Sequence, residues 1–176
     1  MSIIVYTESE KGKLKKTALE VVSYAKAIAD QMGTSVTAVA INADNTESLG
    51  NYGASKVLSI KNDTLNTFNA KSYAAALAQA VKQEEAKVVV VSSSADSKYL
   101  APLLAVGLDA GYASNVVEAP SSVAPFTVKR SAFTNKAFAN IEITTDVKVV
   151  GLSNNSFGLV ETGGSASVED FSSAIP

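Results

Sequence analysis

The chain has 176 residues, enough for one ordinary domain or for one domain with a tail. Its 15 Lys and Arg residues and 17 Asp and Glu residues give a net charge of −2, so the basic excess typical of nucleic-acid surfaces is missing. Cys and His are both absent, which excludes disulfides, thiol nucleophiles, zinc sites built from these residues and triads with an imidazole base. Hydrophobic residues make up 47% of the chain, so it can bury a sizeable core.

The N-terminal residues indicate in which cellular compartment the protein is located. Met1-Ser2-Ile3-Ile4-Val5-Tyr6 resembles neither a secretory signal nor a transit peptide, and it predicts a strand that begins at once. No apolar run in the chain approaches the ~20 residues that a membrane-spanning helix needs. We therefore expect a cytoplasmic protein without membrane insertion.

The first 110 residues alternate predicted strands and helices. Buried-strand patterns are followed by apolar stripes at helical spacing, and Gly33 and Gly111 mark helix ends. The predicted strands cover residues 2–7, 36–41, 56–60 and 87–91, and the predicted helices cover residues 17–32, a second helix capped by Ser72, and residues 98–109. This alternation predicts an α/β fold in three layers, with a mostly parallel sheet covered by helices on both faces.

After Gly111 the pattern changes to short strands separated by Pro, Asn and Asp. The expected strands are residues 115–118, 126–131, 137–144 and 147–152, and we expect them to be antiparallel strands added to the edge of the sheet. Residues 161–176 are rich in Gly and Ser and show no periodicity. They predict a linker or a loosely docked arm, which places the domain at residues 1–160.

One loop is a candidate anion site. Ser92-Ser93-Ser94-Ala95-Asp96 directly follows the strand of four valines, and ligands gather at the carboxyl ends of parallel strands, beside free N–H groups of helix starts. Ser92, Ser93, Ser94 and Asp96 are therefore candidates for holding a phosphate. The alternative is that Ser94 or Asp96 simply caps the following helix. No glycine-rich phosphate loop is present, and the sequence predicts no metal site.

Other charged and aromatic residues carry weaker signals. Arg130 is the only arginine, and it can either pair with an anionic group or protect an exposed strand. The charge pairs at residues 15–16 and 84–85 indicate solvated helix ends. Tyr73 and Tyr99 indicate core or interface positions. No catalytic group is visible.

Several segments, taken in order, resemble one family. They are Ile3-Ile4-Val5-Tyr6-Thr7-Glu8, Gly12-Lys13-Leu14, Ser35–Val39, Tyr52–Val57, Val88–Ser94, Leu100–Ala105, Ser114–Val117, Lys129–Phe133 and Val149–Leu152. Together they resemble the N-terminal domain of the electron-transfer flavoprotein α subunit over nearly the whole chain. Asn135 and Lys136 depart from the Gly-Asn that is usual in the family.

The resemblance implies a fold similar to adenine-nucleotide hydrolase-like modules. It also implies that the intact protein forms a heterodimer with a β subunit. This heterodimer carries electrons from flavin dehydrogenases to an acceptor. FAD is then bound mainly by a C-terminal domain, and the family's Gly-Gly-Arg-Gly stretch is missing from these 176 residues. We expect no cofactor and no catalytic residue in this chain, which is either a first-domain fragment or a natural single-domain relative.

Two further hypotheses stay open at this point. The chain can be a free-standing adenine-nucleotide-binding module of the stress-protein or hydrolase-like class, using residues 92–96. It can also be an enzyme that uses Lys, Tyr or carboxylate groups, although no motif supports that reading. The scaffold hypothesis predicts an apolar surface patch for a partner subunit.

Overall fold

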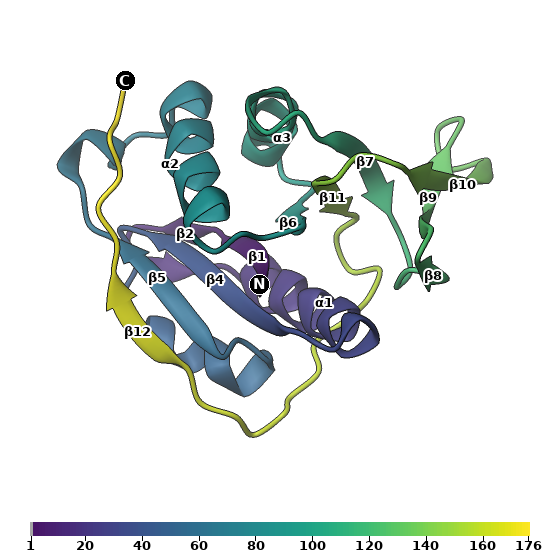
Figure 1. Ribbon diagram of the computed structural model, residues 1–176. Coiled ribbons are helices and arrows are strands. Elements are labelled where there is room, and N and C mark those ends of the chain that lie inside the picture. Colours follow the sequence, from purple (N-terminus) through teal and green to yellow (C-terminus); the bar gives the residue numbers. More distant parts are fainter. Residues whose placement is uncertain (1) are drawn as a thin grey trace.

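The computed structural model describes residues 2–176, and its centre is a mixed sheet between two helical layers (Figure 1). The strands are β1 (Ser2–Thr7), β2 (Ser9–Glu10), β3 (Lys13–Leu14), β4 (Ser35–Ile41), β5 (Lys56–Ile60), β6 (Val88–Ser92), β7 (Gly111–Val116), β8 (Ser122–Val123), β9 (Phe126–Ala132), β10 (Ala137–Ile143), β11 (Lys148–Leu152) and β12 (Ser167–Asp170). The helices are α1 (Lys16–Met32), α2 (Ala70–Gln83) and α3 (Ala95–Gly107), with short 3-10 segments η1 (Thr46–Tyr52) and η2 (Asp63–Leu65).

The main sheet has ten strands within residues 2–176, and its centre is parallel. The order is β10-β9-β7-β11-β6-β1-β4-β5-β12, with β8 paired to β9. β1 pairs in parallel with both β4 and β6, and its residues 2–7 are all buried. β-Branched residues dominate these inner strands because they pack well on a pleated surface that is covered on both sides.

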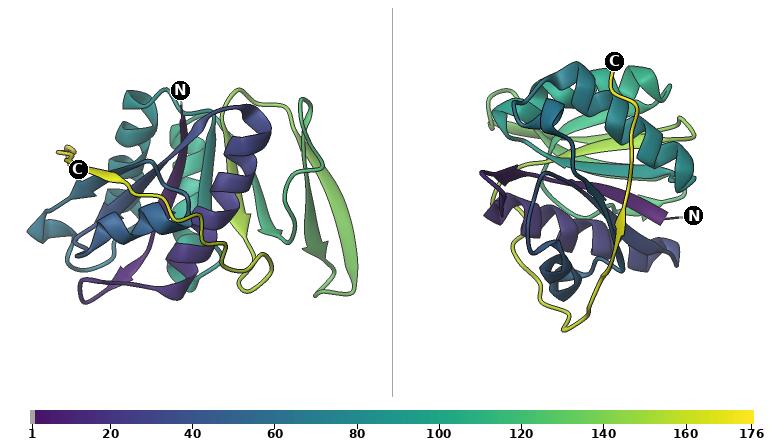
Figure 2. Two further views of the ribbon diagram at one scale, coloured as in Figure 1. Left: turned by 90° about the horizontal axis from the view of Figure 1, so that it is seen from below. Right: turned by 90° about the vertical axis from the view of Figure 1, so that its left-hand side faces the viewer.

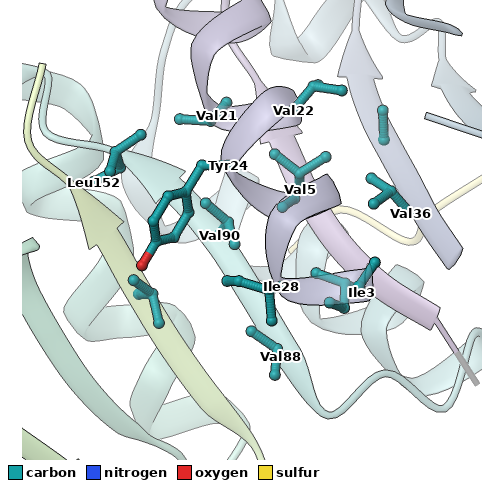
Figure 3. Close-up of a cluster of buried hydrophobic side chains, with 14 of the residues drawn as sticks. Ile3, Val5, Val21, Val22, Tyr24, Ile28, Val36, Val88, Val90 and Leu152 are labelled. Carbon is teal, nitrogen blue, oxygen red and sulfur yellow. The ribbon is translucent and has the colours of Figure 1, made fainter. Parts of the chain in front are cut away.

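Helices cover both faces of the sheet (Figure 2), and each face has its own core of buried side chains. On one face, α1 packs Val21, Tyr24 and Ile28 against inward residues of β1 and β6 (Figure 3). Burial raises the pKa of Tyr24, whose hydroxyl donates to the carbonyl of Glu118 at 2.9 Å. On the other face, α2 and α3 pack against the alternate residues of the same strands. The three-layer α/β prediction is confirmed.

The predicted helices form with small differences at their ends. Gly33 ends α1 in the left-handed conformation, as expected. The N-terminal cap of α2 is Asn69 and not Ser72, because the Asn69 side chain accepts the N–H groups of residues 71 and 72. α3 begins at Ala95, three residues earlier than predicted, because the Ser94 hydroxyl accepts the N–H of Ser97.

The second half of the chain differs from the prediction at two strands. The strand expected at residues 115–118 is β7, which begins at Gly111 and pairs in parallel with β11, and the helix before it already ends at Gly107. β9 and β10 are antiparallel and lie at the edge of the sheet, as expected. β11 instead runs parallel between β6 and β7, inside the sheet. Its residues 149–152 are buried, so it needs helices on both faces, which an edge position does not provide.

The C-terminal tail, residues 161–176, is not a loose arm. It contains β12, which pairs in parallel with β5, and Phe171 is buried against the α2 side of the sheet. The side chain of Gln79 exchanges hydrogen bonds with the backbone of Ala174, at 2.8 and 2.9 Å. Backbone pairing and one buried ring fix this segment, although its Gly- and Ser-rich start indicates a linker. The domain boundary at residue 160 stays a prediction.

Candidate functional site

The candidate anion loop lies where α/β folds of this type bind ligands. β1 and β6 are neighbours, but α1, which follows β1, covers one face and α3, which follows β6, covers the other. The crevice between the carboxyl ends of two such strands is the usual ligand position in open parallel sheets. Ser92 ends β6, Ser94 caps α3 and Asp96 stands in the first turn of α3.

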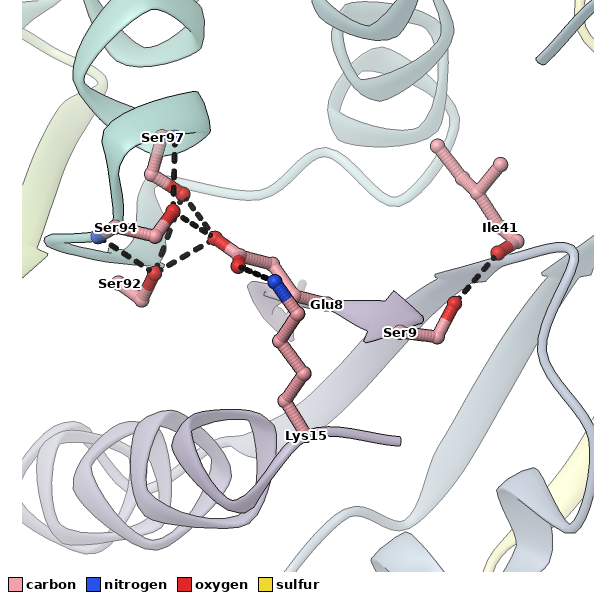
Figure 4. Close-up of polar contacts among 7 residues, drawn as sticks. All are labelled: Glu8, Ser9, Lys15, Ile41, Ser92, Ser94 and Ser97. Carbon is pink, nitrogen blue, oxygen red and sulfur yellow. Dashed lines mark hydrogen bonds and ion pairs between the residues drawn. The ribbon is translucent and has the colours of Figure 1, made fainter. Parts of the chain in front are cut away.

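Glu8 fills this position from the end of β1. Its Oε1 atom accepts hydrogen bonds from the hydroxyls of Ser92, Ser94 and Ser97 at 2.7, 2.6 and 2.5 Å (Figure 4). Its other oxygen, Oε2, lies 3.5 Å from Nζ of Lys15. Three hydroxyl donors at a helix N-terminus make a typical anion site, and here the anion is a carboxylate of the same chain.

The electrostatics of Glu8 follow from these contacts. The side chain is 5% exposed, and burial by itself raises the pKa of a carboxyl group. The hydrogen bonds from Ser94, Ser97 and Ser92, together with the charge of Lys15, outweigh burial, so the pKa of Glu8 lies below its usual value. Glu8 is therefore charged at neutral pH, and its negative charge faces any second anion that enters the crevice.

The predicted residues of the loop have different roles. Ser92 and Ser94 contact Glu8, and Ser94 also caps α3, so the capping alternative is confirmed. Ser93 turns away and donates to the carbonyl of Leu152 at 2.7 Å. Asp96 is exposed and makes no hydrogen bond or ion pair within the described part of the chain, residues 2–176. The four side chains therefore do not converge on one point, and anion binding by this loop stays a prediction.

The sequence reasoning missed the centre of this cluster, which is Glu8 with Lys15 and Ser97. Glu8 directly follows a buried strand, so it lies at the same edge of the sheet as the serines. That signal is visible only once β1 and β6 are known to be neighbours. Lys15 was expected to be a solvated charge, but it contacts Glu8, and Glu84, also expected in solvent, pairs with Lys56 at 2.7 Å.

A cavity of about 330 Å³ adjoins the cluster. Its lining combines aromatic rings with charges of both signs, from Tyr6, Glu8, Ser9, Glu10, Lys11, Lys15, Asn66, Phe68, Tyr73 and Asp96. Burial, and then the nearby charges of Glu8, Tyr73 and Asp96, raise the pKa of Tyr6 well above its usual value. Within residues 2–176, no group of three or more acidic side chains is arranged to hold a metal ion.

Arg130 does not protect an exposed edge. β9 lies between β10 and β7, and Arg130 is half-buried there. Its Nε and Nη2 atoms donate to the carbonyl and hydroxyl oxygens of Ser114 at 3.0 and 3.3 Å. The protective reading was wrong because a further strand covers β9. A binding role for Arg130 stays untested.

Large apolar side chains of residues 2–176 are exposed on α3, on the β9–β10 hairpin and, in the last part of the chain, at Leu159, Val160 and Val168. The first, which we call the α3 patch, consists of Tyr99, Leu103 and Val106, which are 72%, 47% and 78% exposed. It borders an apolar groove of about 270 Å³ between α2 and α3. The second is the β9–β10 hairpin, where Phe133 and Phe138 are 81% and 63% exposed. Tyr73 lies in the core, as expected.

The fold and the crevice define a doubly wound α/β domain. The position that is usual for a ligand in such domains is occupied here by the side chain of Glu8. The family model "Electron transfer flavoprotein domain" matches residues 3–176, and the chain belongs to this family. It is 31% identical over 98% of its length to the electron transfer flavoprotein subunit alpha of Pseudomonas aeruginosa, covering 54% of that protein. It is 26% identical over 82% of its length to the same subunit of Bacillus subtilis, covering 44%.

A further relative is the acryloyl-CoA reductase electron transfer subunit beta of Anaerotignum propionicum, which is 29% identical over 62% of this chain. The chain spans between about one third and one half of the length of these curated relatives. The resemblance seen in the sequence is therefore confirmed, and the chain is an α-type electron transfer flavoprotein domain. Within residues 2–176, no helix is long and apolar enough to cross a membrane.

Proposed function

We propose that this domain is the scaffold of an electron-transfer flavoprotein α subunit and does not itself bind the flavin. The observation that carries this proposal is the position of Glu8. Its carboxylate already uses the three hydroxyl donors at the start of α3, which a phosphate group would need. A phosphate that enters the crevice has to displace the buried, charged Glu8 side chain. It also has to compete with the Glu8 carboxylate for the same three hydroxyl donors.

In this proposal the domain assembles with a β-type subunit, and a separate domain binds FAD. The complex carries electrons from flavin dehydrogenases to an acceptor in the cytoplasm. One relative is named as a subunit of an electron transfer flavoprotein and another as an electron transfer subunit of acryloyl-CoA reductase, which supports an assembly role. The α3 patch is the contact surface that we assign to the partner subunit, since large exposed apolar groups gather there.

A flavin-retention experiment tests the first part. The purified chain is mixed with FAD and desalted, and its visible absorbance is recorded. We expect a colourless protein. A retained flavin band would mean that this domain alone forms a cofactor site, which would overturn the proposal.

Calorimetry with ATP and AMP tests the alternative, a nucleotide-binding module. We expect no heat of binding at millimolar nucleotide. Binding that weakens when Ser94 is replaced by Ala would establish the alternative and place the nucleotide at the start of α3.

Co-purification with a β-type subunit from the same source tests the assembly role. We expect one complex in size-exclusion chromatography and its loss in Val106→Glu. Val160→Glu is the matched control, because Val160 is also exposed, at 51%, and lies outside the α3 patch. A complex that survives Val106→Glu would refute the assignment of the surface.

A further inference from the structure

The cavity of about 330 Å³ beside Glu8 is lined by Tyr6, a buried tyrosine whose hydroxyl has no partner. Tyr6 is 5% exposed, and its hydroxyl makes no hydrogen bond within residues 2–176. The buried hydroxyls of Tyr24 and Tyr73, in contrast, donate to backbone carbonyls. Among residues 2–176, the one fully enclosed side-chain oxygen or nitrogen without a hydrogen bond is Oγ of Ser173. The Tyr6 hydroxyl is therefore not fully enclosed, and the cavity that Tyr6 lines gives access to it.

A hydroxyl in this position calls for an explanation. Nearly all buried polar groups in folded proteins have a hydrogen-bond partner, because a buried group without one costs stability. The Phe side chain has the same ring and would avoid that cost. The hydroxyl of Tyr6 therefore points to a polar group that enters the cavity from outside the chain.

Aromatic rings surround this hydroxyl. The ring of Tyr73 packs edge to face with Tyr6 and with Phe68, at centroid distances of 6.2 and 5.0 Å and interplanar angles of 85° and 70°. Aromatic rings attract cations to their faces. Within residues 2–176, the one lysine that stands over an aromatic ring is Lys129, over Phe138 on the distant β9–β10 hairpin. No cation of the described chain therefore covers the three rings at the cavity.

The charges that line the cavity are mostly negative. Three carboxylates stand against two ammonium groups: Glu8, Glu10 and Asp96 against Lys11 and Lys15. Lys15 pairs with Glu8 at 3.5 Å, whereas Glu10 and Asp96 form no ion pair within residues 2–176. The lining thus carries one negative charge in excess. The pKa of the Tyr6 hydroxyl is raised by burial and then by the charges of Glu8 and Asp96, so negative charge lies close to it.

These features favour one chemical class of ligand. An anion would meet the excess of carboxylates at short range. A metal ion needs several converging oxygen ligands, and no group of three or more acidic side chains within residues 2–176 is arranged in that way. An organic cation suits both the rings and the negative charge. The volume is at the low end of the range of about 300–1,000 Å³ for ligand cavities, so the ligand is small.

We propose that this cavity binds a small primary amine in its protonated form. The ammonium group pairs with the carboxylate of Asp96 and donates a hydrogen bond to the Tyr6 hydroxyl, and the carbon chain lies against the ring of Phe68. A primary ammonium group fits better than a quaternary one, because the unpartnered hydroxyl can accept an N–H. Asp96 is exposed in the first turn of α3, so its side chain can pair with the ligand without giving up another partner.

The proposal is independent of the proposed function, because the amine is neither a flavin nor a nucleotide and the cavity is separate from the α3 patch. Its failure would leave the flavin-retention and assembly experiments unaffected. Lys11 is the lining cation that no carboxylate pairs with in residues 2–176, so it repels the ligand. Lys11→Gln should therefore tighten binding about threefold.

An NMR titration of the ¹⁵N-labelled 176-residue chain with butylammonium chloride, at pH 7 in a buffer without amines, tests the proposal. We expect saturable shifts of the amide signals of residues 6, 68, 73 and 96, with a Kd of about 1 mM. Two ligands of similar size serve as controls. 1-Butanol lacks the charge and butyrate reverses it, and each should bind at least about tenfold more weakly.

Two pairs of variants test the contacts. Asp96→Asn should weaken binding about tenfold, whereas Asp109→Asn, the same charge change at an exposed residue beyond the other end of α3, should leave the Kd unchanged. Tyr6→Phe should weaken binding about threefold and leave Tm unchanged, since the lost hydroxyl has no partner in the chain. Tyr24→Phe should do the reverse, because its hydroxyl donates to the carbonyl of Glu118.

Four results would overturn the proposal. The first is the absence of saturable shifts with butylammonium up to ~50 mM. The second is equal binding of 1-butanol, which would make the cavity a merely apolar site. The third is an Asp96→Asn variant that binds as tightly as Asp109→Asn. The fourth is a Tyr6→Phe variant that loses stability like Tyr24→Phe and keeps its affinity, since the hydroxyl would then serve the fold and not a ligand.

Discussion

Replacing Glu8 tests how much the internal anion stabilises the domain. Glu8→Ala removes the acceptor of three serine hydroxyls and the partner of Lys15. A hydrogen bond to a charged group contributes about 1.5–3 kcal/mol. The three bonds share one oxygen, and the freed hydroxyls can bond to one another or to water, so the losses do not add. We expect a decrease of about 3 kcal/mol in the free energy of unfolding at pH 7.

Urea denaturation followed by circular dichroism measures this change. For a chain of this length the decrease corresponds to a fall in Tm of about 6–12 °C. Glu8→Gln keeps the size of the side chain and should lose less than Glu8→Ala. Glu10→Gln is the matched control, because Glu10 is exposed two residues further on. If Glu8→Ala unfolds at the same urea concentration as the parent chain, the Glu8 carboxylate does not stabilise the start of α3.

The same variants predict a pH dependence. The pKa of Glu8 is lower in the folded chain than in the unfolded chain, so its charged form stabilises the fold. This contribution is complete above the unfolded pKa, about 4.3, and it is lost as the pH falls through the folded pKa. The stability difference between the parent chain and Glu8→Gln should therefore be constant from pH 7 to ~5 and shrink in stronger acid. A difference that stays unchanged at pH 3 would contradict this reasoning.

Three further substitutions test how the last quarter of the chain is held. Glu20→Ala removes the carboxylate that accepts the N–H groups of residues 155, 157 and 158 at 3.0–3.1 Å. We expect the free energy of unfolding to fall by about 2 kcal/mol, and the amides of residues 157 and 158 to exchange faster. Phe171→Ala should release the tail to proteolysis at a cost of about 3 kcal/mol, whereas Val168→Ala, at a 45% exposed position, should not. Gly50→Ala places a methyl group 2.3 Å from the backbone nitrogen of residue 166, so it should release the tail too. Gly107→Ala, which meets no atom within 4 Å, should leave the tail protected.

Much of the fold could be predicted from the sequence because the signals are local. Four consecutive valines predict β6, and one apolar stripe ending at Gly33 predicts α1. The position of β11 could not be predicted in this way. Its five residues suit either an edge or an interior strand, and only the packing of the neighbouring strands decides between them.

The candidate site shows the same limit. The serines of residues 92–94 were visible as a loop after a strand, and their capping role follows from local chemistry. Glu8 lies more than eighty residues away in the sequence, and it meets the serines only because β1 lies beside β6. The strand pairing of the tail could not be predicted, because a strand at an edge needs little hydrophobic pattern. Four exposed residues pair with β5 through their backbone, and one of them, Glu169, also forms an ion pair with Lys56 at 3.9 Å.

The pairing of β12 with β5 has a consequence for synthesis of the chain. The two strands are separated by about 110 residues, and ribosomes add about 5–20 residues per second. For roughly 5–20 seconds the outer edge of β5 therefore waits on the nascent chain without its partner strand. During that interval this edge is open to chaperones or to a neighbouring nascent chain. It is covered only once β12, which follows all other strands of the sheet in the sequence, has been made.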